Sequence, residues 1–290
     1  MPACFERKGG NVEIINKVEA LKQALNSARK EGKSVGFVPT MGALHQGHMD
    51  LVSRASAECD VVVVSVFVNP TQFNNSDDLK HYPRTPEADA ELLKKFGCDL
   101  AFFPSNGEIY PENWISPRVD LDGLDQVMEG KFRPGHFKGV VQVVSRLFEI
   151  VEPQKAFFGL KDFQQVAVIK KMVEQLNLPL QIVECETSRT EKGLAMSSRN
   201  KRLSETQQEE ALIIFRTLSQ AKVDAVKFSP EETMARAINY FEQGNLKLEY
   251  LTIVDPTTLM ELKDNWVPGA TMCIACFCGE VRLIDNLTLL

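Results

Sequence analysis

The sequence has no long apolar run, no excess of positive charge and only four histidines. No stretch of its 290 residues stays apolar over the roughly 20 residues that a membrane span requires. Its 33 lysines and arginines are outnumbered by 39 aspartates and glutamates, and the net charge of −6 disfavours a nucleic-acid partner. Residues 1–8 lack the apolar core of a signal peptide. We therefore expect a cytoplasmic protein with neither a membrane nor a nucleic-acid partner.

Cysteine is also sparse. The seven cysteines are an odd number and mostly dispersed, which is typical of reduced thiols. Cys273, Cys276 and Cys278 form one cluster, which could be part of a metal site or of a strand with small buried side chains. A closed zinc site needs four ligands, and no second Cys/His pair is nearby in the sequence, so the strand is favoured.

The first two thirds of the sequence alternates short apolar runs with amphipathic stretches. Strands are predicted at 34–39, 61–68, 100–103, 156–158 and 180–183, and helices at 17–31, 47–58, 86–96, 139–151 and 163–175. This alternation is typical of an α/β fold with a doubly wound parallel sheet. The all-valine run 61–64 suits a central strand that is covered on both faces.

The pattern changes near Glu186. Two helices are predicted at 204–221 and 230–243, followed by strands at 247–254, 270–278 and 281–284. Helices followed by strands indicate a separate, smaller α+β domain. We therefore expect two domains, 1–186 and 187–290.

Two of the four histidines fall in the loop that follows the first core strand. His45 and His48 are three residues apart where this loop enters a helix, so they share one face of its first turn. A helix N-terminus is a natural phosphate site, and imidazoles there can donate hydrogen bonds to charge that grows in a transition state. The alternative is a pair of exposed or metal-binding histidines. The H-x-G-H pattern resembles the HIGH motif of adenylate-forming nucleotidyl transferases, whereas the Walker A and G-x-G-x-x-G phosphate loops are absent.

Three further segments carry polar side chains that suit such a ligand. An Asn-Pro turn leaves Gln72 near the same sheet edge, or is simply a turn. Asp89 could help to hold a metal ion on a triphosphate, or be an ordinary acid in the first turn of a helix. The basic, glycine-containing stretch 133–140 suits an anion but could equally be a surface connection.

Two more loops place cations beside the expected site. Lys161 follows a predicted strand and could reach a phosphate, and Asp162 is placed to cap the next helix. Ser197, Ser198 and Arg199 follow Gly193 at the domain junction, where two hydroxyls and a guanidinium could bind a phosphate. A solvated linker is the alternative for this last segment.

These segments, taken together, resemble the pantothenate synthetase (pantoate–β-alanine ligase) family. The matching pieces occur in the order and spacing of the family: PTMGALHQGH, VFVNPTQF, YPRTPEAD, RPGHFKGV, FGLKDFQQ and GLAMSSRN. YLTIVDPTTL and VRLIDN also resemble its second domain, so the resemblance covers nearly the whole chain.

The resemblance implies a Rossmann-like N-terminal domain, a smaller C-terminal lid, a homodimer, and a reaction that uses ATP with Mg²⁺. The carboxylate of pantoate would attack the α-phosphorus and release pyrophosphate, and the amine of β-alanine would then attack pantoyl adenylate and expel AMP. The implied roles are catalysis and phosphate binding by His45, His48 and Lys161; further ATP contacts by Met41, Gly159, Asp162, Met196, Ser197, Ser198 and Arg199; pantoate binding by Gln72 and Gln165; and assistance to the metal by Asp89.

The chain departs from the family pattern at Leu160, where a glutamate is common, and at Lys192, where an aspartate is common. Three other interpretations stay open. Another HIGH-type nucleotidyl transferase would use a phosphorylated substrate, and an aminoacyl-tRNA synthetase would need a tRNA-binding surface. A non-catalytic binding protein on the same fold is the third. The paired glutamines argue against a phosphorylated substrate. The acidic net charge argues against a tRNA-binding surface, and the intact histidines argue against a non-catalytic protein.

Overall fold

The structure is a computed structural model that describes residues 12–74 and 76–290. The expectation for residues 1–8 lies outside the described residues. Within the described part, no helix is both long enough and apolar enough to cross a membrane.

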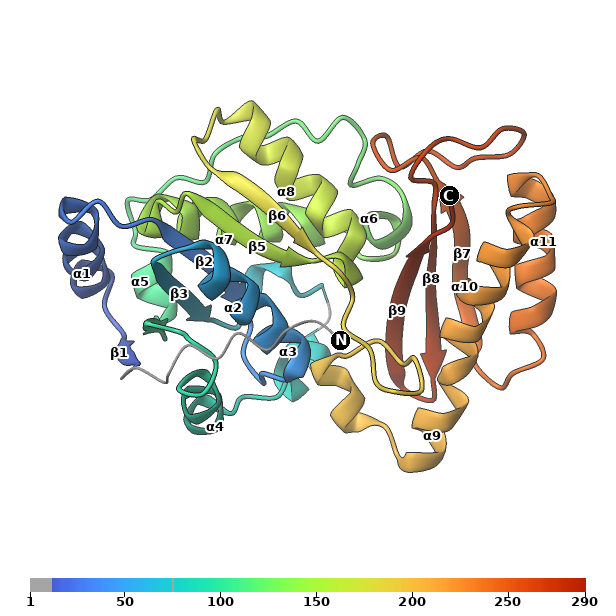
Figure 1. Cartoon of the computed structure of the whole chain (residues 1–290), viewed down its shortest axis with the longest axis horizontal. Helices are drawn as coiled ribbons and strands as arrows, with labels where there is room; N and C mark the ends of the chain where they lie inside the picture. The colour runs from blue at the N-terminus through green and yellow to red at the C-terminus, as the bar shows by residue number, and fades with distance from the viewer. Residues whose placement is uncertain (1–11, 75) are drawn as a thin grey trace.

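A six-stranded parallel sheet forms the first part of the molecule, in the order β1-β4-β3-β2-β5-β6 (Figure 1). Its strands are β1 (Glu13–Ile15), β2 (Val35–Thr40), β3 (Val61–Val66), β4 (Leu100–Phe102), β5 (Lys155–Gly159) and β6 (Gln181–Cys185). β2 lies between β3 and β5, and nearly all of its residues are buried. The predicted doubly wound α/β fold is therefore confirmed.

Successive apolar residues of the strands face opposite sides of the sheet, and helices cover both sides. Phe37 and Val63 belong to one core together with α1, α7 and α8, whereas Val38 and Val64 belong to the other with α2 and α4. The helices and 3₁₀ turns of this part are α1 (Val18–Lys30), α2 (Gln46–Glu58), η1 (Pro70–Gln72), α3 (Ser76–His81), α4 (Pro86–Leu93), α5 (Asn106–Ile109), α6 (Met128–Phe132), α7 (His136–Val151), η2 (Leu160–Asp162) and α8 (Phe163–Gln175).

The second part is a three-stranded antiparallel sheet, β7-β8-β9, with helices on its outer face (Figure 1). Its elements are η3 (Ser198–Arg202), α9 (Glu205–Glu210), α10 (Leu212–Asp224), α11 (Pro230–Phe241), β7 (Lys247–Val254), β8 (Thr271–Cys278) and β9 (Val281–Thr288). The predicted strand with Cys273, Cys276 and Cys278 is confirmed as β8, and all three thiols are buried. The smaller α+β unit is confirmed too. The last strand of the first part, β6, ends at Cys185, and the domain boundary after residue 186 stays a prediction.

Several boundaries differ from those predicted. The helix predicted at 204–221 is two helices, because hydrogen bonding at Ala211 changes to an i to i−3 pattern, with Ile214 N donating to Ala211 O at 3.1 Å. The helix predicted from 139 begins at His136, just after Gly135 with φ of +81°. β9 runs four residues beyond the predicted end, as far as Thr288. β1, α3, α5 and α6 are short and were not predicted from the sequence.

Candidate active site

The topological switch point of the sheet lies between β2 and β5, which are neighbours in space but far apart in the chain. Ligands of doubly wound sheets bind beyond the carboxyl ends of the strands at such a point. The loop after β2 carries the two histidines, and the segment after β5 carries Lys161. The loop after β3 carries Gln72. The fold therefore brings three of the sequence motifs to one edge.

A cavity of about 210 Å³ lies at this edge. Every site residue predicted from the sequence, with the exception of Asp89, lines it: Met41, His45, His48, Gln72, Gly159, Lys161, Asp162, Gln165, Met196, Ser197, Ser198 and Arg199. The rest of its wall is mixed, with apolar side chains from α7 and β5 and several polar ones. A pocket that combines an apolar wall with converging polar groups is the usual form of a small-molecule site.

The two histidine rings lie together at the start of α2, with centroids 4.0 Å apart. Burial, with the nearby charge of Lys161, lowers the pKa of His45 to about 4. Burial and the neighbouring His45 lower the pKa of His48 well below its usual value. Both rings are therefore neutral at pH 7. They can donate hydrogen bonds but carry no charge.

Hydrogen bonding selects the tautomer of His48. Its Nδ1 accepts from the backbone N–H of His45 at 3.3 Å. Because a neutral imidazole has one donor and one acceptor nitrogen, Nε2 of His48 carries the proton. The Nδ1 of His45 is buried and has no hydrogen-bond partner among the described residues. His48 thus offers a hydrogen-bond donor of fixed orientation, and His45 has a ring nitrogen with no partner among the described residues.

Asp89 is the one predicted site residue that lies apart from the cavity. Its side chain is 2% exposed, and its two carboxylate oxygens accept from the backbone N–H groups of Ala43 and Leu44 at 2.9 and 2.8 Å. The hydroxyl of Thr85 donates to it as well, at 3.1 Å. Because both of its oxygens accept hydrogen bonds from the backbone, this carboxylate does not fit the magnesium-binding role that the sequence suggested. Instead, it holds the loop that leads into His45.

Gln72 is held by its neighbours at the cavity wall. Its Oε1 accepts from the side-chain amide of Asn69 at 3.2 Å, and its Nε2 contacts the sulfur of Met41 at 3.0 Å. Gln165 lines the same cavity, and its side chain makes no hydrogen bond to any described residue. Its neighbour Gln164 is buried and bonded to three backbone groups around α6, so it has a structural role. The two glutamine amides at the cavity are those of Gln72 and Gln165.

Lys161 and Asp162 lie where the small cavity meets a larger cleft between the two sheets. Their side chains are 3.5 Å apart, which is a loose contact. Asp162 occupies the N-cap position of α8, as expected, but its side chain makes no capping hydrogen bond there. Its carboxylate is half exposed and stays available to a ligand.

The segment 197–199 closes the cavity from the side of the C-terminal part. Ser198 is buried, and its hydroxyl lies 3.2 Å from that of Tyr82. Arg199 pairs with Asp78 of α3 at 2.9 Å. Tyr82 lies inside the YPRTPEAD segment, but sequence reasoning assigned it no role. Its side chain is 6% exposed and lines the cavity.

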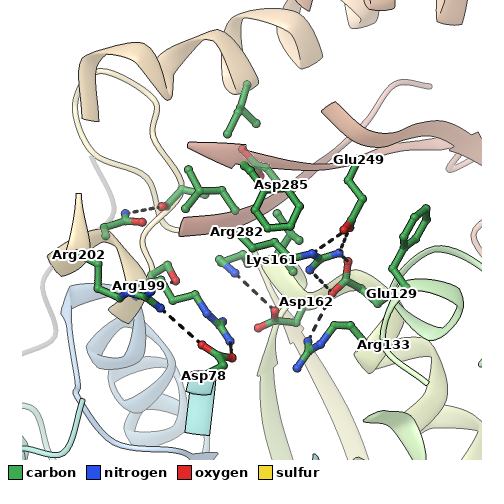
Figure 2. A pocket seen from close by; sticks show the side chains of 18 of the residues that line it. Asp78, Glu129, Arg133, Lys161, Asp162, Arg199, Arg202, Glu249, Arg282 and Asp285 are labelled. Atoms are coloured by element: carbon green, nitrogen blue, oxygen red, sulfur yellow. Dashed lines mark hydrogen bonds and ion pairs between the residues drawn. The ribbon is translucent and has the colours of Figure 1, made fainter. Parts of the chain in front are cut away.

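The larger cleft, of about 710 Å³, opens between the parallel sheet and β9. Figure 2 shows Lys161 and Asp162 between the Arg199–Asp78 pair and a second ion pair that joins Glu129 to Arg282. Arg282 of β9 donates to both carboxylate oxygens of Glu129 at 2.7 and 2.8 Å. The sequence did not indicate this pair, because its members are 153 residues apart.

Comparison with known proteins agrees with this geometry. The sequence pattern of the family described as pantoate-beta-alanine ligase matches residues 13–288. The chain belongs to this family. A pantothenate synthetase of Porphyromonas gingivalis is 52% identical over 282 residues, which cover 95% of this chain and 99% of that protein. A relative from Bacteroides thetaiotaomicron with the same name is 49% identical over 279 residues, with 95% and 98% covered.

Solved structures of the pantoate-beta-alanine ligase family have the same fold. A pantothenate synthetase from Thermus thermophilus superposes with a TM-score of 0.90 at 42% identity, over 96% of this chain and 99% of that chain. A pantoate-beta-alanine ligase from Francisella tularensis, complexed with beta-gamma ATP and beta-alanine, has a TM-score of 0.80 at 35% identity, over 96% and 98%. The resemblance found in the sequence motifs is therefore confirmed over nearly the whole chain.

Proposed function

We propose that this protein condenses pantoate with β-alanine to pantothenate in an ATP-dependent reaction that passes through pantoyl adenylate. The observation that carries the proposal is the single cavity at the switch point, where neutral histidines, Lys161, Arg199 and two glutamine amides meet. The family membership supports the same reaction.

The first step needs no protein nucleophile. The carboxylate of pantoate is already ionised at pH 7, so one of its oxygens attacks the α-phosphorus while the bond to the β-phosphate oxygen breaks and pyrophosphate leaves. The Nε2–H of His48 donates to the charge that grows on the phosphate oxygens. The ammonium of Lys161 and the guanidinium of Arg199 bind the phosphates. His45 adds a second imidazole beside His48.

Pantoate fits the mixed lining of the cavity. Its carboxylate and two hydroxyls suit the amides of Gln72 and Gln165, and its two methyl groups suit the apolar wall from α7. A phosphorylated substrate would require cations where these amides stand. Met41 contacts Gln72 and completes this side of the site. The ribose and the rest of the nucleotide would lie against Gly159 and Met196.

Magnesium enters with the nucleotide in this proposal. No cluster of three or more His, Cys, Asp or Glu side chains that could hold a metal ion occurs within residues 12–74 and 76–290. Magnesium sites commonly use one or two carboxylates, waters and the substrate phosphates. Asp162, which is half exposed beside Lys161, is the carboxylate that fits this part, and the metal would supply further charge stabilisation to the phosphates.

In the second step the neutral amine of β-alanine attacks the acyl carbon, AMP leaves with the electrons of the broken C–O bond, and the nitrogen releases one proton to water. Acyl adenylates hydrolyse in water, so the narrow cavity has a purpose in excluding it. The homodimer and the cytoplasmic location implied by the sequence stay predictions, and light scattering of the purified protein would test the first.

The two departures from the family pattern lie outside the cavity. Leu160 and Lys192 are not among its lining residues. Lys192 instead forms an exposed ion pair with Glu209 at 2.7 Å. Exposed pairs of this kind contribute little free energy. Both positions are therefore compatible with a working catalytic site.

The proposal is tested by AMP release from ATP, Mg²⁺, pantoate and β-alanine, with each component omitted in turn. We expect release only with all four components. Pantoate-dependent exchange between ATP and labelled pyrophosphate, without β-alanine, would isolate the first step. Exchange without pantoate, or no exchange by folded protein that binds ATP, would contradict the proposal and favour another acid substrate or a non-catalytic relative.

A further inference from the structure

A side chain of the C-terminal part holds the segment that carries Lys161. Asn286 of β9 donates one amide hydrogen to the backbone carbonyl of Leu160, at 2.8 Å, and the other to that of Lys161, at 3.0 Å. Asn286 is 8% exposed, so water does not readily replace these bonds. The side chain of Asn286 thus links β9 to the backbone of η2 at Leu160 and at Lys161 itself.

Asn286 is itself fixed by a buried ion pair. The guanidinium of Arg189 donates to both carboxylate oxygens of Asp285, at 2.6 and 2.9 Å. The same guanidinium reaches the backbone carbonyl of Asn286 at 3.1 Å, and Asp285 Oδ1 accepts from the backbone N–H of Asn286 at 2.8 Å. Arg189, Asp285 and Asn286 therefore form one connected group, which we call the Arg189 cluster. A bidentate arginine–carboxylate pair is geometrically specific and so defines the direction of Asn286.

The Arg189 cluster also holds the second phosphate-binding segment. Arg189 donates to the carbonyl of Gly193 at 3.1 Å and stacks on the ring of Phe215 at 4.3 Å. It pairs with Ala195 across a β-bridge, and the chain from this hairpin leads directly into Ser197. Figure 2 shows Asp285 on the C-terminal side of the cleft, opposite the Arg199–Asp78 pair. One cluster thus contacts the backbone of the Lys161 segment and the hairpin that leads into residues 197–199.

We propose that Asn286 is a positioning residue for Lys161, and that the Arg189 cluster sets the spacing between the Lys161 ammonium and the 197–199 segment. This inference rests on the proposed function, in which both segments bind the same phosphates. Asn286 does not line the small cavity and acts only through the backbone of η2. A displacement of a catalytic group by about 1 Å can cost on the order of a hundredfold in rate.

The first test is Asn286→Ala in pantoate-dependent pyrophosphate exchange. We expect the rate at saturating ATP to fall at least roughly tenfold, because the Lys161 segment loses both anchors. Asn245→Ala is the matched control, since Asn245 is an exposed asparagine of the same part whose side chain bonds to Glu210, away from η2. Asn286→Asp, which keeps the side-chain volume but removes the donors, gives the same test if the alanine variant does not fold.

A double-mutant cycle separates positioning from a general structural role. If Asn286 acts through Lys161, then Asn286→Ala costs little further activity in a Lys161→Ala background. An equal fold loss in both backgrounds would overturn the inference, as would unchanged exchange by folded Asn286→Ala and Asn286→Asp. A Lys161→Ala variant with full activity would instead contradict the proposed function, so the two failures are distinguishable.

Discussion

Among single residues, His45 and His48 are uncharged, and this limits their role near the phosphates to hydrogen bonding. Burial keeps the pKa of His45 at about 4 and that of His48 lower than its usual value. Positive charge near the phosphates therefore comes from cations that line the cavity, such as Lys161 and Arg199, while His48 supplies an oriented donor. Asp89 contributes indirectly, because it holds the backbone of Ala43 and Leu44 ahead of this pair.

We expect His48→Ala to lower the rate of pantoate-dependent pyrophosphate exchange by roughly a hundredfold, as the loss of one preorganised donor does. His81→Ala is the matched control, because His81 is exposed on α3 and its ring bonds to the backbone carbonyl of Asp77. Near-normal exchange by folded His48→Ala protein would remove the assigned role.

At the scale of elements, the pantoate side of the cavity depends on the close approach of α7 to η1. Gly139 lies in the first turn of α7, and its carbonyl accepts from Asn69, the residue that orients Gln72. A Cβ at this glycine would lie 2.4 Å from the carbonyl oxygen of Thr71 and 2.6 Å from the Cα of Gln72. Only glycine allows this packing without moving η1.

Gly139→Ala should therefore displace Gln72. We expect the KM for pantoate to rise at least about tenfold, with a smaller change for ATP, and a loss of about 1–3 kcal/mol in the free energy of unfolding. Gly107→Ala on α5 is a suitable control, since nothing lies within 4 Å of its added Cβ. Equal changes in the two KM values would argue against a local effect on the pantoate side.

For the whole molecule, β9 ties the two parts together at two places beside the cleft. Asn286 joins β9 to η2, and the Glu129–Arg282 pair joins α6 to β9. Tyr250 of β7 also donates to Glu129, at 2.9 Å. Burial alone would raise the pKa of Glu129, but the hydrogen bonds and charge of Arg282 outweigh it and hold the pKa at about 2.

This depressed pKa makes the tie sensitive to acid. The stabilisation from ionised Glu129 is complete above its unfolded pKa of 4.5 and is lost as the pH falls toward 2. We expect Glu129→Gln to reduce the free energy of unfolding by about 3 kcal/mol at pH 7 and by roughly half of that or less at pH 3. Denaturant titrations at both pH values measure this difference.

Glu112→Gln, in an exposed loop, is the control for the loss of a surface charge, and we expect it to change stability by less than about 0.5 kcal/mol at either pH. A Glu129→Gln effect that is equally large at pH 3 and pH 7 would show that the ion pair is not its source.

The order of the main strands and helices, and the loops that hold the site, follow from the amino-acid sequence alone. Apolar runs such as Val61–Val66 form buried parallel strands because they have no polar face, and parallel strands bring their carboxyl ends to one edge. The loops with His45, Gln72 and Lys161 could therefore be predicted to meet. Short elements such as β1 escaped prediction, because three residues give no detectable period.

The partners of the polar side chains, by contrast, depend on how the chain folds in three dimensions. Asp89 and Asp162 both precede or begin helices in the sequence, yet the first is buried against a loop and the second is half exposed at the cleft. Arg282 lies more than a hundred residues from Glu129, and Lys161 lies more than a hundred residues from Asn286. Local sequence patterns do not predict such contacts. The contacts form only when β9 packs against α6 and η2 in the folded chain.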